Sequence, residues 1–220
     1  MRKPTTAPEQ GRLGVLMNDG EKLVQVHKFE REAHSLFAQG NWLESESNYI
    51  SCLQLQTQLL GASNTFLFPN LAHLVGCQLE LQKRAEAKEN LLWALRIFNQ
   101  KPDKVLKLVS NRRDQMDIWG PLARASREMA EPKNDPVYWK WCASFYELDL
   151  HAWKGRTDDD RYRSLAQEYC TALDNSGDKP KAFALRQELN LPQPQTPRPK
   201  ASKPHRRAEI WTGDTKSFGR

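Results

Sequence analysis

The sequence has no run of 18 apolar residues, and no apolar segment follows its basic first residues. A membrane-spanning helix needs about 20 predominantly apolar residues, so no membrane contact of that kind is expected. A secretory signal needs an apolar segment of roughly 7–15 residues near the N-terminus, so no signal peptide is expected either. We therefore expect a cytoplasmic protein.

The common signatures of catalysis and nucleotide binding are also missing. The chain contains no phosphate-binding loop, dinucleotide-binding glycine pattern, nucleophile elbow or zinc-protease helix. His151 lies close in sequence to Asp149 and Asp158, a combination that occurs in acid–base sites, but no nucleophile accompanies it in a known motif. We expect a non-enzyme without a cofactor. A helical enzyme with an unfamiliar site remains the alternative.

The four cysteines are scattered and form no C-x-x-C pair. Each falls in a helical pattern, which favours buried thiols over disulfides. His73 and Cys77 are four residues apart and share a helix face, but a closed zinc site needs four ligands and no third lies close in sequence. No metal site is expected, and a packed thiol beside a core histidine is the simpler interpretation.

No stretch alternates apolar and polar residues with the period of a β-strand. Apolar residues instead recur three and four positions apart, which places them on one face of a helix. The pattern predicts an all-α protein with a helical domain at 19–190, a disordered segment at 1–18 and a flexible tail at 191–220. Helices are expected at 19–39, 41–60, 69–82, 85–99, 103–110, 122–129, 137–154, 161–173 and 180–189. The helix at 103–110 could also continue to 119.

Several residues mark the ends of these helices. Asn18 or Asp19 can cap the first helix, and Gly40 can adopt the left-handed conformation that ends it. Gly120 and Pro121 predict a break or kink between two helices. The aromatic residues of 137–154 lie on more than one face, and we expect most of them in the core, with any exposed ring marking a partner site.

The net charge of +6 is unevenly distributed. Seven of the basic residues and only two acidic ones lie in 198–220, so the rest of the chain is nearly neutral. A basic flexible arm attracts polyanions without sequence preference, although it can also be a merely solvating end. If the tail binds, the expected contacts are Arg198, Lys200, Lys203, Arg206, Arg207 and Trp211.

The first two helices resemble a tetratricopeptide repeat. Phe29 occupies the first aromatic position of that pattern, Ala33 the close-contact position and Gly40 the turn, while Ser45 and Tyr49 match the small–x3–aromatic pair. Glu32 and Thr57 depart from it. Residues 69–98 match more weakly, and 137–189 could form a third, degenerate pair. A helical bundle that merely shares this spacing is the alternative.

The resemblance implies a short solenoid of antiparallel helix pairs, with the first helix of each pair lining a concave groove for peptides. On that resemblance the groove residues are His27, Glu30, His34, Phe37, Ala72 and Gly76. A solvated helix face is the competing interpretation. The hypothesis that follows is a scaffold or adaptor that binds a protein or peptide. The alternative is a nucleic-acid-associated protein that binds through its tail, and the oligomeric state is left open.

Overall fold

The computed structural model describes residues 17–110, 116–153 and 159–193, and these contain helices and no strand. The fold is therefore all-α, as predicted. Its elements are α1 (Asp19–Ala38), α2 (Trp42–Leu60), η1 (Thr65–Leu67), α3 (Phe68–Glu80), α4 (Arg84–Gln100), α5 (Pro102–Ser110), α6 (Met116–Ala130), η2 (Glu131–Lys133), α7 (Pro136–Ala152), α8 (Asp160–Ser176) and α9 (Lys179–Glu188).

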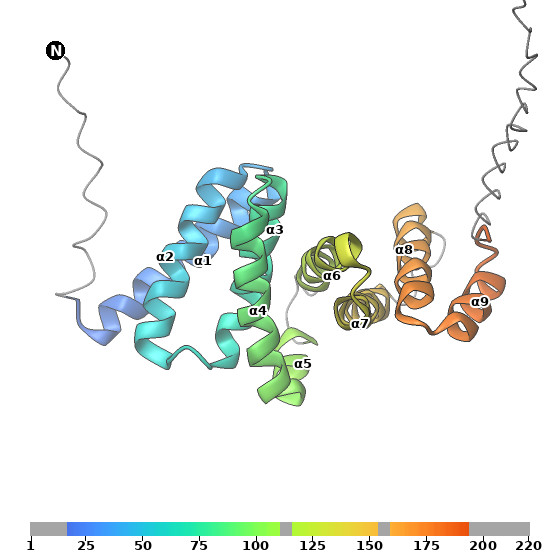
Figure 1. Ribbon diagram of the computed structural model, residues 1–220. Coiled ribbons are helices and arrows are strands. Elements are labelled where there is room, and N and C mark those ends of the chain that lie inside the picture. The colour runs from blue at the N-terminus through green and yellow to red at the C-terminus, as the bar shows by residue number, and fades with distance from the viewer. Residues whose placement is uncertain (1–16, 111–115, 154–158, 194–220) are drawn as a thin grey trace, which may run out of the picture.

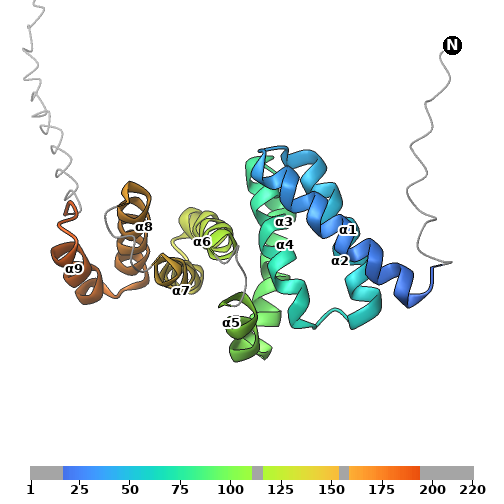
Figure 2. The same ribbon diagram turned by 180° about the vertical axis from the view of Figure 1, so that it is seen from behind.

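Helices that follow each other in the chain pack against each other, and Figure 1 shows them as a row from α1 to α9. The pairs α1–α2, α3–α4, α6–α7 and α8–α9 are each joined by a short connection. Helix α5 lies outside this row, and α6 takes the place beside α3. The reverse view in Figure 2 shows the same order. Residues 137–189 span the three helices expected there, α7 to α9, so this segment contains more than one helix pair.

Local sequence explains how the first helix begins and ends. The Asn18 side chain accepts a hydrogen bond from the Glu21 amide, and the Glu21 carboxylate accepts one from the Asn18 amide, at 3.0 and 2.8 Å. This reciprocal pair is a capping box. Gly40 has a φ of +73°, which favours glycine and lets the chain turn into α2. Both features confirm the predicted ends.

Small residues bring α1 and α2 together. Ala33 is fully buried, and the buried Ser45 hydroxyl donates to the Ala33 carbonyl at 2.9 Å. Tyr49 is also fully buried one turn further along α2. The two helices therefore meet at the small positions that the sequence indicated. A connected hydrophobic core extends from here to Leu191 through the described residues.

The predicted break at Gly120–Pro121 is wrong, because α6 continues through both residues. Proline normally collides with the Cβ of the residue before it and removes one backbone hydrogen bond. Gly120 has no Cβ, so the clash with the residue before the proline is largely relieved here, although the hydrogen bond from position 121 to the Asp117 carbonyl is lost. The helix-forming residues on both sides of Gly120–Pro121 therefore keep α6 continuous.

Candidate ligand-binding groove

An open groove of about 300 Å³ lies where the α1–α2 turn meets α6, α7 and α8. Its apolar walls are formed by Phe37, Trp42, Pro121, Tyr146, Trp153 and Leu165. The charged residues that line it are Asp117, Arg124, Asp149, Arg161 and Glu168. Five helices thus contribute to one concave surface that is apolar along its sides and charged at several points.

Two of the groove residues, Phe37 and Pro121, come close to Gly76 of α3. A Cβ at this position would lie 3.2 Å from Phe37 Cε2 of α1 and 3.3 Å from Pro121 Cγ of α6. Larger side chains would push these rings away. The absence of a side chain at Gly76 therefore allows Phe37 of α1 and Pro121 of α6, both of which line the groove, to approach α3 closely.

A cluster of aromatic rings supports this end of the groove. The His73 ring stacks on Tyr49 with centroids 5.5 Å apart, and it meets His34 and Phe37 edge-on at 4.6 and 5.1 Å. His34 Nδ1 and the Tyr49 hydroxyl are 3.0 Å apart, within hydrogen-bonding distance. Phe37 also packs edge-on against Trp42 at 5.0 Å. Edge-to-face rings at these distances hold each other's orientation, so Phe37 and Trp42 present fixed faces to the groove.

Asp149 of α7 is the most unusual residue that lines the groove. Its side chain is only 4% exposed, and its Oδ1 has no hydrogen-bond partner among the described residues. Burial raises the pKa of Asp149 from 3.8 to about 7, Arg161 opposes the rise, and the negative charges of Asp117 and Glu168 add to it. A buried acceptor without a donor is costly, commonly by about 1–3 kcal/mol. Few buried polar atoms of native proteins lack a partner, so this one calls for an explanation.

Most other charged residues of the groove are already engaged. The Tyr146 hydroxyl donates to Glu168, and this bond together with burial raises the pKa of Tyr146. The Arg161 guanidinium lies over the Trp153 ring, 4.9 Å from its centroid. Arg124 donates to Glu80 at 2.8 Å. Asp149 thus stands apart as a buried charge whose acceptor atom is not satisfied within the described chain.

The residues predicted to line a groove are only partly in this one. Phe37 lines it, whereas His27 is exposed on α1 and Glu30 and His34 are half-buried. Ala72 and Gly76 are buried inside the helix row, so neither presents a surface to a partner, because the next helices pack over the α3 face that carries them. The predicted tail contacts, from Arg198 to Trp211, lie outside the described residues.

The histidine and cysteine that were considered as metal ligands, His73 and Cys77, make packing contacts in the helical core. His73 belongs to the aromatic cluster, and the Cys77 thiol lies 3.4 Å from Ser45 Oγ. All four cysteines are buried and free, as predicted, and burial raises the pKa of Cys77 to about 11. Across 17–110, 116–153 and 159–193, no three histidine, cysteine, aspartate or glutamate residues come together as a metal site. His151 is exposed while Asp149 is buried, so the two do not form an acid–base pair.

The burial of Asp149 was not predicted, although the sequence carries a signal for it. The inward-facing positions of α7 follow the helical spacing Cys142, Phe145, Tyr146, Asp149 and Trp153, and all five are buried. An aspartate in such a stripe is a polar residue at a core position. Most aromatic residues of α7 are in the core, as expected, and Tyr138 and Trp141 are half-buried.

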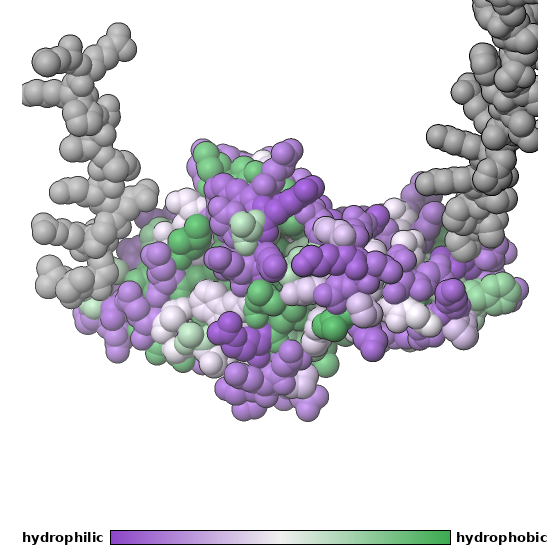
Figure 3. Space-filling model, viewed as in Figure 1, coloured by the Kyte–Doolittle hydropathy of each residue, from purple (hydrophilic) through white to green (hydrophobic). Residues whose placement is uncertain are grey.

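A second hollow of about 410 Å³ lies between α4, α6 and α7. Arg84 and Glu128 line it and pair with each other at 3.0 Å. Outside these hollows the view in Figure 3 is mostly hydrophilic, with separate hydrophobic patches. None of the charged residues that line the larger hollow is buried, whereas Asp149 is, so the groove at Asp149 is the stronger candidate site.

No protein-family profile and no curated protein sequence matches the chain. Among solved structures, the chain is similar to the crystal structure of BtubC (BKLC) from P. vanneervenii. The two are 14% identical, the match covers 81% of this chain and 69% of that chain, and the TM-score is 0.47. This level of similarity assigns neither a fold family nor a function. Within the described part of the chain, no helix has the length and apolar character of a membrane span.

Proposed function

We propose that this chain is a non-enzymatic, tetratricopeptide-like adaptor that binds a peptide or protein segment in the groove between α1–α2 and α6–α8. The observation that carries the proposal is an open, aromatic-walled groove lined by a buried carboxylate without a hydrogen-bond donor. Apolar walls supply contact area, and a few polar groups fix the orientation of what is bound. Stacked helix pairs commonly form extended concave binding surfaces of this kind.

Panning a random peptide library on the full chain tests the proposal. We expect the affinity of enriched peptides to change when the charge of Arg161, which is exposed and lines the groove, is reversed by Arg161→Glu. The matched control is Arg163→Glu, because Arg163 is exposed on the same helix and does not line the groove. Peptides that bind both variants equally, or no enriched peptide at all, would contradict the proposal.

A further inference from the structure

The free acceptor of Asp149 restricts what the groove can bind. Oδ1 has no donor among the described residues, while Oδ2 lies 3.1 Å from the position of a Cβ built on Gly120. Oδ2 therefore lies beside α6 at a point where a residue larger than glycine would crowd it. A ligand that satisfies this carboxylate must bring a hydrogen-bond donor.

The charges around Asp149 favour a donor that is positively charged. Asp117 and Glu168 line the same groove and add negative potential near the Asp149 carboxylate. Arg124 is held by Glu80, and Arg161, whose charge acts on Asp149, lies over the Trp153 ring, so Oδ1 of Asp149 still has no donor among the described residues. A buried charge is stable only when it is paired, so a cation is the complementary group.

The walls of the groove favour a cation on an apolar stem. Phe37, Pro121 and Leu165 offer hydrocarbon surface, and the Tyr146 and Trp153 rings add aromatic surface. A lysine buries its four methylene groups along such surface and carries a compact charge at its end. The planar fork of arginine is suited to two exposed carboxylate oxygens, which the buried Asp149 does not offer.

We infer that the segment bound in this groove places a lysine side chain between the apolar walls, with its ammonium group donating to Asp149. This inference rests on the proposed function and specifies the chemistry of the partner. Binding transfers no proton and forms no covalent bond. The occupant is a partner segment, and arginine, the chain's own tail or a purely apolar peptide are the alternatives that the experiment distinguishes.

The test uses NMR titration of the isotope-labelled full chain at pH 8 with N-acetyl-lysine-N-methylamide. We expect it to shift the backbone signal of Gly120 and the indole signal of Trp153, and the norleucine and arginine analogues to shift them far less. In Asp149→Asn, the affinity for the lysine compound should fall by about tenfold or more, equivalent to about 1.4 kcal/mol. Equal shifts from norleucine or arginine would overturn the inference.

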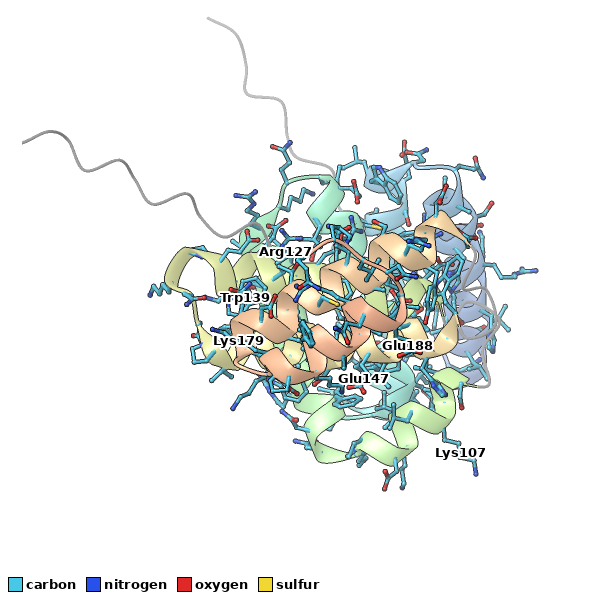
Figure 4. All side chains as sticks on the ribbon, turned by 90° about the vertical axis from the view of Figure 1, so that its right-hand side faces the viewer. Lys107, Arg127, Trp139, Glu147, Lys179 and Glu188 are labelled. Atoms are coloured by element: carbon cyan, nitrogen blue, oxygen red, sulfur yellow. The ribbon has the colours of Figure 1, made fainter. Side chains whose placement is uncertain are left out.

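A matched variant separates the role of Asp149 from general effects of charge. Glu147→Gln makes the same chemical change on α7, but Glu147 is exposed and pairs with Lys181 at 2.8 Å. Figure 4, which views the row from its α9 end, labels Glu147 on that side of the molecule. Lysine binding should be unchanged in Glu147→Gln, and an equal loss in both variants would overturn the inference.

The peptides from library panning distinguish the two proposals. A lysine in the enriched sequence, with binding lost in Asp149→Asn and on replacing that lysine by norleucine, supports both. Groove peptides without a lysine, and insensitive to Asp149→Asn, would overturn the lysine inference while the adaptor function stands. If Lys200→Gln and Lys203→Gln in the full chain raise its affinity for the lysine compound, the chain's own tail is the occupant and the partner assignment is wrong.

Discussion

The α1–α4 region and the α6–α8 region bury charged side chains in different ways. In the first, Glu46 is 5% exposed and accepts hydrogen bonds from Lys83 at 2.5 Å and Gln78 at 3.4 Å. In the second, Asp149 is equally buried but retains an oxygen without a donor. A buried charge that is paired stabilises the packing around it, whereas an unpaired one is a cost that binding can relieve.

The largest expected effect concerns Asp149, the buried carboxylate that lacks a donor among the described residues. Asp149→Asn should raise the free energy of unfolding at pH 8 by about 3 kcal/mol, because it removes a buried negative charge. The folded-state pKa is about 7 and the ordinary value is 3.8. This carboxyl therefore contributes most stability below pH 4 and loses that contribution as the pH rises towards 7.

Urea denaturation of Asp149→Asn and the unchanged chain at several pH values measures this effect. The stability difference should grow between pH of about 4 and 7 and level off above it. Comparing the two proteins at each pH cancels the titration of other carboxylates. Glu147→Gln serves as the control, with an expected change of less than about 0.5 kcal/mol. A difference that does not vary with pH would contradict the prediction.

The same chemical change at Glu46 should have the opposite sign. Glu46→Gln leaves Lys83 without its ionic partner and weakens the hydrogen bond from Gln78. We expect the free energy of unfolding at pH 8 to fall by about 2 kcal/mol, the usual scale for a hydrogen bond to a charged group. Chemical denaturation measures it, and a gain in stability would remove the distinction between the two regions.

The smallest expected effect concerns two fully buried serines. Ser45 bridges α1 and α2 through the Ala33 carbonyl, whereas Ser126 donates to Leu122 of its own helix at 2.8 Å. Ser45→Ala should cost about 1 kcal/mol, and Ser126→Ala less than about 0.5 kcal/mol, because a bond within the helix adds little to its backbone bonds. Thermal unfolding measures the loss of stability in both variants. Equal losses would show that the hydrogen bond from Ser45 to α1 stabilises the protein no more than the bond of Ser126 within its own helix.

Local sequence patterns were sufficient to predict most of the helices. The cap at Asn18 and the turn at Gly40 depend on residues within a few positions of each other, so the interactions that decide them are visible in the sequence. Burial of all four thiols also followed from helical spacing. The break predicted at Gly120–Pro121 was wrong, because glycine and proline each disfavour a helix on their own. When glycine precedes proline, however, it removes the clash that the proline ring would make with a Cβ.

The groove could not be predicted from the same patterns. Its walls come from Phe37 and Trp42 near one end of the sequence and from Tyr146, Trp153 and Leu165 more than 100 residues later. They meet because α6, and not α5, packs beside α3. The resemblance to helical repeats indicated a groove on the first helix of each pair, and of its six residues only Phe37 lies in the groove observed.

By itself the sequence determined the all-α character of this protein and the ends of most helices, because turns, caps and apolar stripes act over three or four residues. Only the tertiary structure decided which helices are neighbours, and with that the place where Asp149 loses water without gaining a donor. Desolvation depends on everything that surrounds a group, and those surroundings come from distant parts of the chain.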